Sequence, residues 1–509
     1  MVPRFVDTVV LGAGSAGCVV AAKVSERGAR DVLLVEAGPD YPDAVPDDLR
    51  DGTRNSMRAH DWGYAHRPSA RQRLPFPLPR GRVVGGSSAV NTCIALRGVP
   101  ADYNEWAARG LPAWTWDQCL PAFKRIERDL DPDVDDALHG RDGPLPVRRH
   151  PREELAPWQA AFLDAARALG FPAVRDHNHP DAEGAGPHAM NKVDGVRQSA
   201  ARCWLTPAVR ARENLTILPN TLAHRVIFER GRVAGVELET HGVRRSVACR
   251  RVVLCAGALA SPGVLLRSGV GPREDVTRVG ASPVLALRGV GARLLDHPGT
   301  AVFLWPRRGV ARVSDPLIQV ALRTRAEGEN FPGGLQVQPG SFWAFPFASL
   351  PGVSLMMHVG KTSATGSIRW TSSDPRHAPE VRSNLFGHPR DRAVAWQGLS
   401  LIRELAHTAP LRDLARIAWP RESVLKDRAR TEAMLPTHCD SGYHPCGTAP
   451  MGDDGDPDAV TDQHGRVRGV EGLYLADASI MPTIPTANIH LTVLMVAERI
   501  GTWLRDEAI

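Results

Sequence analysis

Apolar and polar positions near the start of the chain follow a strand–turn–helix–strand pattern. Val6–Leu11 is a short apolar run rich in valine, and Asp31–Glu36 is a second run that ends in an acid. Residues 18–27 lie between these runs and carry valines on one side of a helical repeat. The glycine-rich turn Gly12–Gly17 directly follows the first run. Together these elements predict a βαβ unit that binds a dinucleotide.

The glycine turn has the spacing that a pyrophosphate site requires. Gly12 permits the tight turn, Gly14 lets the backbone approach the pyrophosphate, and Gly17 allows close packing of helix on strand. The start of the following helix offers free N–H groups and a positive dipole end. Glu36 lies 19 residues after Gly17, where an acid accepts hydrogen bonds from both ribose hydroxyls. This favours FAD or NAD over NADP, because an acid repels a 2′-phosphate.

Later apolar runs predict further strands and a final helix. Residues 222–238 are expected to form two strands separated by a turn at 230–232, and residues 250–260 a buried strand that ends in small residues. Between residues 300 and 435, strand-like runs alternate with loops, which indicates an antiparallel sheet. Leu491–Leu504 has apolar positions at helical spacing. The pattern therefore predicts an α/β fold with a second, sheet-rich region.

Length and composition are those of an ordinary globular enzyme. The 509 residues suffice for two to four domains, and 43% of them are apolar and 23% charged. The net charge of +6 comes from 62 basic and 56 acidic residues. The basic residues are nearly all arginines scattered along the chain, with no basic block. We therefore expect a mildly basic enzyme rather than a nucleic-acid binder.

The sequence favours a cytoplasmic location. No stretch reaches the roughly 18 consecutive apolar residues of a membrane helix. The N-terminal apolar run leads into the glycine turn rather than a cleavage site, so it is expected to be a core strand. Eight cysteines form no Cys-x-x-Cys pair, which favours reduced, buried thiols.

Two polar segments have residue types that could bind a metal. Asp129–Asp136 is an acidic run, and His177-Asn178-His179 is flanked by Asp176 and Asp181. Neither has the spacing of a known metal motif. We expect a solvated loop and a polar loop, and no metal.

Six separated motifs make the sequence resemble the glucose–methanol–choline (GMC) family of oxidoreductases. The resemblance covers essentially the whole chain. The motifs are Gly12–Gly17 with Glu36-Ala37-Gly38, GRVVGGSSAVN at Gly81–Asn91, GALASPGVLLRSGVGP at Gly257–Pro272, VGARLLDHP at 290–298, YHPCGTAPMG at Tyr443–Gly452, and the C-terminal stretch Val467–Gly501.

The resemblance implies a division into two domains. One is a Rossmann-like FAD-binding domain assembled from residues 1–155, 200–299 and 440–509. The other is an α+β substrate-binding domain built on an antiparallel sheet, from residues 156–199 and 300–439. Residues 300–435 are expected to build the substrate pocket.

The resemblance also implies two catalytic histidines, His444 and His490. Oxidation of an alcohol needs a base for the hydroxyl proton, and a neutral imidazole suits this task. We assign His444 as the principal base and His490 as the partner that orients the hydroxyl; reversed or shared roles stay open. His297, His438 and His464 are assigned structural roles.

The implied cofactor is FAD. The cofactor-binding residues are Gly12, Gly14, Ser15, Ala16, Gly17, Glu36, Ala37, Arg82, Val84, Gly85, Gly86, Ser87, Asn91, Thr92, Cys93, Ile94, Val226, Ala256, Gly257, Tyr443, Asp477, Ala478, His490, Leu491 and Thr492. Some family members attach flavin through a histidine at the position of Val90, so we expect non-covalent FAD here.

Particular roles are expected for some of these residues. The backbone at Asn91-Thr92-Cys93 lies along the isoalloxazine, with the Cys93 side chain as packing. Asp477 either bonds the ribityl–pyrophosphate region or only orders its turn. Val226 contacts the adenine side through its backbone. The helix at 491–504 directs its positive end at the flavin N1–C2=O edge, an effect typically worth about 0.3–1 kcal/mol.

The preferred function is FAD-dependent oxidation of a small-molecule alcohol to an aldehyde or ketone, with electrons passed to O2 or another acceptor. A lyase on the same scaffold, of the hydroxynitrile lyase or fatty acid photodecarboxylase type, is the alternative. A non-catalytic flavoprotein would be expected to lack one of the two histidines. An NAD(P)-dependent dehydrogenase explains only the first 40 residues. Aromatic, furan, aliphatic, polyol and sterol alcohols stay open as substrates, as do oxidase against dehydrogenase and monomer against homodimer; neither membrane nor nucleic acid is expected as a partner.

Overall fold

The first strand lies between two parallel neighbours. In the computed structural model, which describes residues 3–56, 58–345 and 348–507, β1 (Phe5–Leu11) pairs with β2 (Val32–Val35) on one side and β14 (Val243–Leu254) on the other. Helix α1 (Ser15–Val24) connects β1 to β2. The predicted βαβ unit is confirmed. Its helix begins three residues early, because the small residues at 15–17 carry no apolar signal.

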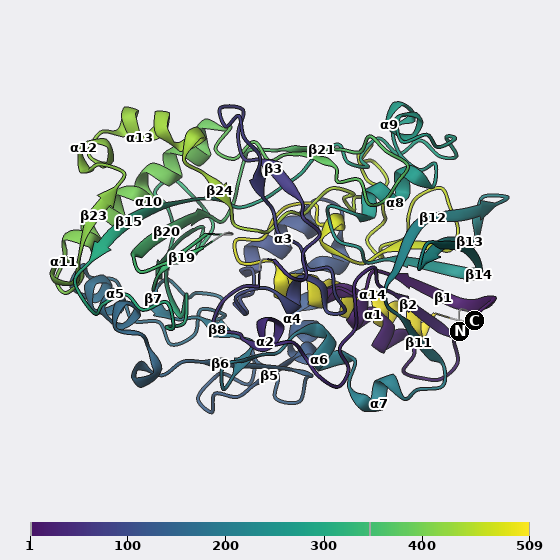
Figure 1. The fold of residues 1–509 in the computed structure, drawn as a ribbon, viewed down its shortest axis with the longest axis horizontal. Helices are drawn as coiled ribbons and strands as arrows, with labels where there is room; N and C mark the ends of the chain where they lie inside the picture. Colours follow the sequence, from purple (N-terminus) through teal and green to yellow (C-terminus); the bar gives the residue numbers. More distant parts are fainter. Residues whose placement is uncertain (1–2, 57, 346–347, 508–509) are drawn as a thin grey trace.

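Seven strands form the sheet around this unit, in the order β11-β2-β1-β14-β13-β12 with β25 beside β14. The added strands are β11 (Leu215–Leu218), β12 (Thr221–Glu229), β13 (Arg232–Thr240) and β25 (Leu473–Leu475). The predicted pair of strands at 222–238 is confirmed. Helix α14 (His490–Asp506) packs against α1, so the two ends of the chain lie side by side (Figure 1). Gly501 lets these helices approach, since a Cβ there would lie 3.0 Å from the Cβ of Lys23.

A second seven-stranded sheet occupies the opposite end of the molecule (Figure 1) and confirms the antiparallel sheet expected within 300–435. Its order is β23-β15-β20-β17-β16-β7, with β24 beside β15. The strands are β7 (Gly184–Pro187), β15 (Pro298–Pro306), β16 (Val320–Thr324), β17 (Leu335–Gly340), β20 (Val353–Val359), β23 (Ala415–Trp419) and β24 (Asp440–Ser441).

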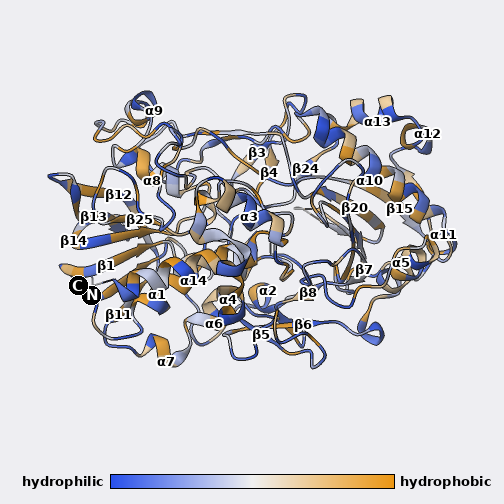
Figure 2. Cartoon of the chain, turned by 180° about the vertical axis from the view of Figure 1, so that it is seen from behind, coloured by the Kyte–Doolittle hydropathy of each residue, from blue (hydrophilic) through white to orange (hydrophobic). Residues whose placement is uncertain are grey.

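Helices α5 (Pro157–Ala168) and α10 (Pro389–His407) pack against this second sheet and share a core with it. In Figure 2, α10 alternates hydrophobic and hydrophilic residues, as expected for a helix with one face on a sheet. One face of the sheet is therefore covered by helices. The other face is left to line a cavity.

Four smaller sheets complete the described structure, and two of them join segments that are distant in sequence. The sheet β21-β22-β3-β4 brings β3 (Ala65–Arg67) and β4 (Phe76–Pro77) to β21 (Ser367–Arg369) and β22 (Glu380–Arg382). Three others contain β5 (Glu127–Asp129), β6 (Leu145–Arg149) and β8 (Ala189–Met190); β9 (Lys192–Val193) and β10 (Val196–Arg197); and β18 (Trp343–Ala344) and β19 (Ser349–Leu350). The boundaries between the two domains stay a prediction.

The remaining helices are mostly short and lie at the surface or between the sheets. They are α2 (Asp47–Arg50), α3 (Pro100–Ala108), α4 (Trp116–Ile126), α6 (Ala200–Trp204), α7 (Pro207–Arg210), α8 (Ser261–Arg267), α9 (Arg273–Arg278), α11 (Leu411–Leu414), α12 (Glu422–Leu425) and α13 (Arg428–Met434). Within the described ranges, no helix combines the length and apolar character of a bilayer span. All eight cysteines are buried free thiols.

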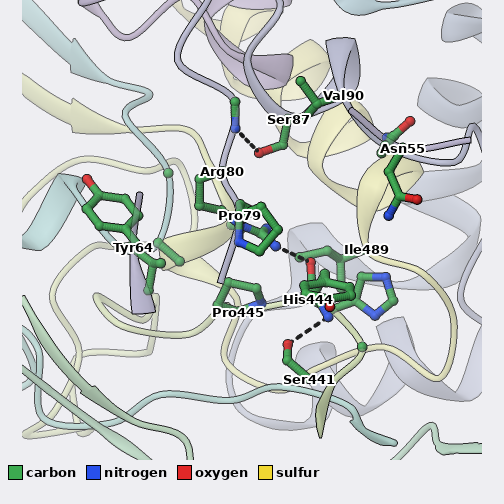
Figure 3. Close-up of a pocket in the computed structure, with 18 of the residues that line it drawn as sticks. Asn55, Tyr64, Pro79, Arg80, Ser87, Val90, Ser441, His444, Pro445 and Ile489 are labelled. Atoms are coloured by element: carbon green, nitrogen blue, oxygen red, sulfur yellow. Dashed lines mark hydrogen bonds between the residues drawn. The ribbon is translucent and has the colours of Figure 1, made fainter. Parts of the chain in front are cut away.

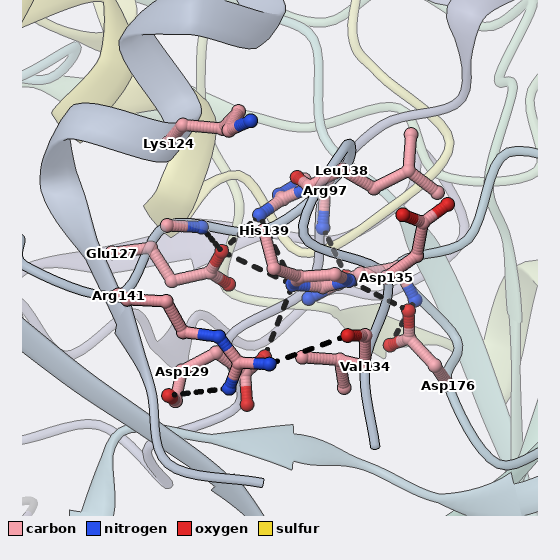
Figure 4. Close-up of polar contacts among 12 residues, drawn as sticks. Arg97, Lys124, Glu127, Asp129, Val134, Asp135, Leu138, His139, Arg141 and Asp176 are labelled. Atoms are coloured by element: carbon pink, nitrogen blue, oxygen red, sulfur yellow. Dashed lines mark hydrogen bonds and ion pairs between the residues drawn. The ribbon is translucent and has the colours of Figure 1, made fainter. Parts of the chain in front are cut away.

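A buried polar cluster lies beside β5 (Figure 4). His139 contacts the carboxylates of Glu127 at 3.1 Å, Asp129 at 3.0 Å and Asp176 at 2.9 Å. Burial lowers the pKa of His139, but hydrogen bonds to the three carboxylates outweigh it and raise the pKa to about 10. Arg149 contacts Asp129 at 2.9 Å. The cluster therefore holds positive charge between its carboxylates.

This cluster corrects the expectation of a solvated acidic loop for Asp129 alone, since Asp131, Asp133, Asp135 and Asp136 are partly or fully exposed. Asp129 is only 3% exposed, because Arg149 and His139 supply the charge that lets it leave water. His177 and Asn178, expected in a polar loop, are likewise buried. Ligand atoms of Glu127, Asp129 and His139 lie within 4.8 Å of one another, as at a metal site. The absence of a metal stays a prediction; Arg97 and Arg149 already pair with Glu127 and Asp129.

We predict that Arg149→Met destabilises the protein by about 3–5 kcal/mol, because it removes one of the two cations that compensate the buried Asp129 and also the partner of Asp176. Arg175→Met is the matched control. Arg175 pairs with Asp133 at 2.7 Å, but both side chains are mostly exposed, so its loss should cost about 0–1 kcal/mol. Thermal melting of the flavin-loaded variants measures the difference. Equal melting temperatures for the two variants would contradict this account.

Candidate active site

A cavity of about 730 Å³ lies where the first sheet faces the second. Its lining includes residues at the ends of β1, β2 and β14, together with Asp477 after β25. Ligands of open α/β sheets bind at these carboxyl ends of parallel strands. On its far side the cavity reaches β15, β17 and β20 of the second sheet. One continuous space therefore joins the dinucleotide unit to the sheet-rich region.

Three backbone segments approach one another closely at the dinucleotide end. Gly12 has φ +99°, and a Cβ there would lie 2.6 Å from the carbonyl oxygen of Cys255. A Cβ on Gly86 would lie 2.6 Å from the Cα of Gly14. Helix α1 has no side-chain cap at Gly14, so its first N–H groups are available to a phosphate. This cradle fits a pyrophosphate.

Glu36 lines the same end of the cavity and is tied to the glycine turn. Its carboxylate accepts hydrogen bonds from the backbone N–H groups of Ala13 at 3.0 Å and Gly38 at 2.9 Å. Burial raises the pKa of Glu36 to about 7, although these N–H groups and Arg82 oppose the shift. The carboxylate thus lies where it can accept hydrogen bonds from a ribose, and its pKa is close to neutral pH.

Asp477 orders a turn and lines the cavity as well. Its Oδ2 accepts hydrogen bonds from the Gly257 N–H at 2.7 Å and the Ser261 hydroxyl at 2.6 Å. Its Oδ1 accepts one from the Ser479 N–H at 2.8 Å. The carboxylate joins the segments that follow β14 and β25, which are both at the pyrophosphate end.

The structure places most of the expected cofactor-binding residues on the cavity, but not all. Those that line it are Gly12, Gly14, Ser15, Ala16, Glu36, Ala37, Gly86, Ser87, Asn91, Thr92, Ile94, Ala256, Gly257, Tyr443, Asp477, Ala478 and His490. Those absent from the lining are Gly17, Arg82, Val84, Gly85, Cys93, Val226, Leu491 and Thr492.

Several of the latter residues pack behind the wall. A Cβ on Gly17 would lie 1.8 Å from the Gly12 carbonyl oxygen, so this glycine serves helix packing. Cys93 is fully buried in an apolar cluster. The Val226 N–H donates to Ser268 Oγ at 2.8 Å, and Leu222 and Ala223 of the same strand line the cavity instead.

The loop that carries His444 lies beside Arg80 and Ser441 (Figure 3), and a buried carboxylate holds it. Asp296 accepts hydrogen bonds from the Ser441 hydroxyl and from the backbone N–H of His444 at 2.9 Å. Arg80 donates to the carbonyl oxygen of Tyr443 at 3.0 Å. Tyr443 itself has φ +64°, so the chain turns sharply just before His444. These contacts set the direction in which the imidazole points.

His444 and His490 both line the cavity and are both neutral. Burial, with smaller contributions from His297, His358 and Arg80, holds the pKa of His444 well below its usual range. Burial alone lowers the pKa of His490 to about 4. Among the described residues, His490 Nε2 has no hydrogen-bond partner. His490 is the first residue of α14, one position earlier than the apolar pattern predicts.

The second sheet forms one wall of the cavity. Residues paired across its neighbouring strands form rows, here called rungs, and these rungs change from polar to aromatic along the strands. The first rung across β15, β20 and β17 is Gly299, His358 and Gln336. A Cβ on Gly299 would lie 2.7 Å from the His358 ring, so the glycine makes room for that imidazole. His358 Nδ1 has no partner among the described residues. This rung offers polar groups to a ligand close to His444.

The rungs farther along the strands are less polar. The next is Ala301, Met356 and Gln338, and the third begins with Phe303, which stands beside Trp419 of β23. Phe303 also meets Trp343 edge to face, with ring centroids 5.6 Å apart. The cavity therefore ends in an aromatic cluster. The sequence did not locate it, because the ring-bearing strands come together only through sheet pairing.

Comparisons with known proteins match the whole chain. The family described as GMC oxidoreductase matches through its N-terminal part at residues 6–299 and its C-terminal part at residues 362–497. The chain belongs to the GMC oxidoreductase family. It is an oxidoreductase of the alcohol oxidase or dehydrogenase type, and its cofactor is FAD, which the cradle fits. The expected family, fold class and cofactor are thereby confirmed.

Three relatives illustrate the match. The chain is 35% identical to 5-(hydroxymethyl)furfural oxidase of Methylovorus sp. (strain MP688), over 100% of each chain. It is 32% identical to oxygen-dependent choline dehydrogenase of Vibrio vulnificus (strain YJ016), over 97% of this chain and 93% of that one. The crystal structure of pyridoxine 4-oxidase from Mesorbium loti superposes with a TM-score of 0.90 at 30% identity, covering 99% of this chain and 100% of that one.

We predict that FAD binding weakens as the pH falls below about 7. The cofactor favours the carboxylate of Glu36 as acceptor, whereas burial has raised the pKa of this group to about 7. Below that pH a proton competes with FAD, so the Kd should rise by up to about tenfold per pH unit. Titration of the apoprotein with FAD at about pH 8 and about pH 6, followed by flavin fluorescence, measures the change.

Glu36→Gln is the matched control for this prediction. It keeps the shape of the side chain but has no titrating proton, so its Kd should be weaker and independent of pH over the same range. A wild-type Kd that stays constant, or an equal slope in the variant, would show that Glu36 does not govern the dependence.

Proposed function

We propose that this protein oxidises a small-molecule alcohol to an aldehyde or ketone, with His444 accepting the hydroxyl proton and electrons passing to O2 or another acceptor. One observation carries the proposal: two neutral imidazoles, His444 and His490, face the cavity that also contains the dinucleotide cradle. The names of the relatives, which include oxidases of hydroxymethylfurfural and pyridoxine, support an alcohol substrate.

The two histidines are suited to different parts of the proton transfer. His444 is neutral because it is buried, so its imidazole has a nitrogen lone pair that can take a proton. His490 Nε2 has no hydrogen-bond partner in the described part of the chain, and a buried polar atom of this kind calls for a ligand. A substrate hydroxyl between the two rings would satisfy both. His444 would take the proton, and His490 would orient the oxygen.

The chain's own residues account for how FAD is held. When bound, FAD supplies the acceptor for the hydride that leaves the alcohol carbon. The glycine cradle, Glu36 and Asp477 would hold its dinucleotide part. The first turn of α14 has no side-chain cap, so N–H groups such as that of Leu491 would face its flavin edge. Val90 has no group able to bond to flavin, in keeping with non-covalent binding.

The sheet wall favours an alcohol with a polar end and an apolar body. The polar rung of Gly299, His358 and Gln336 lies near His444, while Phe303, Trp343 and Trp419 lie farther along the strands. An alcohol group at the first rung would leave the rest of the substrate against the aromatic rings. Flat and apolar bodies suit such a surface.

Anaerobic reduction tests the reaction type. Purified protein is mixed with a panel of aromatic, furan, aliphatic and polyol alcohols, in the dark and without O2, while the visible flavin band is recorded. Bleaching by an alcohol supports the proposal, and admission of air then separates an oxidase from a dehydrogenase by the rate at which colour returns. Yellow protein that no alcohol bleaches would speak against it.

We predict that His444→Ala keeps its flavin but loses turnover by about 10²- to 10⁴-fold, the usual contribution of a general base. The steady-state rate with the best alcohol and the flavin-to-protein absorbance ratio are the two measurements. His464→Ala is the control, because His464 is partly exposed and packs on Trp503 away from the cavity lining. Normal turnover in His444→Ala would refute the assignment of the base.

A further inference from the structure

A chain of hydrogen bonds runs from a backbone carbonyl to the proposed base. His297 Nε2 lies 2.9 Å from the carbonyl oxygen of Pro485, and His297 Nδ1 lies 2.9 Å from Nδ1 of His444. On its other side, His444 Nε2 lies 3.1 Å from the amide nitrogen Nδ2 of Asn488. The two imidazole rings meet nearly edge to face, at an interplanar angle of 77°.

The chemistry of these groups allows one arrangement of protons. A carbonyl oxygen only accepts, so His297 Nε2 carries the hydrogen. A neutral imidazole has one N–H, so His297 Nδ1 is bare and accepts from His444 Nδ1. Because the one N–H of His444 is at Nδ1, its Nε2 carries no hydrogen. The amide nitrogen of Asn488 can only donate, and it donates to this Nε2. The hydrogen bonds at Nδ1 and at Nε2 therefore both require the same tautomer of His444.

His297 remains neutral in this arrangement. Burial, and then the neighbouring His358, lowers the pKa of His297 to about 3. Its hydrogen bonds to backbone carbonyl oxygens act in the opposite direction but are outweighed. It therefore does not compete with His444 for the substrate proton. A neutral partner also leaves the His444 lone pair available, whereas a carboxylate at this place would favour the protonated imidazole.

The fold sets this contact through strand register. Pairing of β15 with β24 places Pro298 opposite Ser441, and the N–H of Gly442 donates to the His297 carbonyl oxygen at 2.8 Å. Gly442 also provides space, since a Cβ there would lie 3.0 Å from His444 Nδ1. Consecutive residues thus hold the two parts of His444: Asp296 binds its backbone N–H and His297 binds its ring.

We propose that His297 is a positioning residue that fixes His444 in the tautomer with Nδ1 protonated and Nε2 unprotonated, so that Nε2, which accepts from Asn488 here, can accept the substrate proton in exchange for that hydrogen bond. The proposal rests on the proposed function, since it takes His444 as the base. In the reaction the substrate O–H bond breaks and an N–H bond forms at Nε2, while the electron pair of the C–H bond leaves as hydride to FAD. The His444 imidazolium keeps its Nδ1–H bond to His297 throughout.

Two variants of nearly equal shape separate positioning from packing. Asn at 297 offers an oxygen that can accept the His444 Nδ1–H, and Leu offers none. His297→Leu should lower kcat by about 10- to 100-fold with little change in KM or flavin content, because a lost hydrogen bond to a charged group has this effect. His297→Asn should retain kcat within a few fold. Equal losses in the two variants, or an unchanged kcat in His297→Leu, would overturn the proposal.

The tautomer itself is read by ¹⁵N NMR of flavin-loaded protein labelled at histidine. The His444 signals are identified by their absence in His444→Ala. Wild type should show the protonated nitrogen at Nδ1, and His297→Leu a shift toward the Nε2-protonated form. A wild-type His444 protonated at Nε2 would overturn the proposal even if a variant failed to fold.

These measurements separate failure of this inference from failure of the proposed function. If His444→Ala turns over normally, the proposed base is wrong, and the NMR spectrum still reports what His297 does to the ring. If His444 is required but the Leu and Asn variants behave alike, the base stands and only the role of His297 falls.

Discussion

Pairing between β15 and β24 is the interaction on which the assembly of the site depends. It is short, with two paired positions, yet it brings Asp296 and His297 to the loop that carries His444. Beyond His444 the chain is joined to the segment after β25, through hydrogen bonds from Gly447 to Ala478 and from Ala449 to Ser479. One strip of backbone thus connects the sheet that lines the substrate end with the sheet that carries the dinucleotide cradle.

Burial without a charged partner is what gives the histidines their chemistry. His297, His358, His444 and His490 all have lowered pKa values, with burial as the largest cause in each. The nearby carboxylate of Asp296 is directed at a backbone N–H and the Ser441 hydroxyl rather than at a ring. A carboxylate bonded to His444 would raise the pKa of the imidazole and leave it already protonated. Because Asp296 binds the backbone N–H of His444 and not its ring, the imidazole stays neutral and can act as a base.

Sequence patterns predicted what local spacing determines. The βαβ unit, the strand pair at 222–238 and the C-terminal helix are all set by residues within one short segment. The choice of Val226, which the resemblance implied as a backbone contact to the adenine, shows the limit: its N–H donates to Ser268 Oγ, and the cavity is lined by Leu222 and Ala223, beyond a register irregularity in β12. Burial of Asp129 could not be predicted either, since Arg149 and His139 reach it from later segments.

The role of His297 was hidden for the same reason, because its partner is 147 residues away. By sequence it is one of several histidines without a helical or metal-binding pattern. The signal lies in the tautomer, which requires knowing what each ring nitrogen contacts. Such information arises only when strand register is known.

The buried ionic cluster around His139, which includes Arg97 through its ion pair with Glu127, lies behind the wall of the cavity and supports it. Ile94 lines the cavity, and Asn178 accepts a hydrogen bond from the N–H of Arg97 while donating one to the carbonyl oxygen of Ala95. Arg97 and Asp176 beside Asn178 are both members of the cluster. A wall that must lie flat along a large cofactor needs support on the side away from it. Charged groups that are paired with one another provide such support with directional bonds, and their mutual attraction offsets part of their desolvation cost.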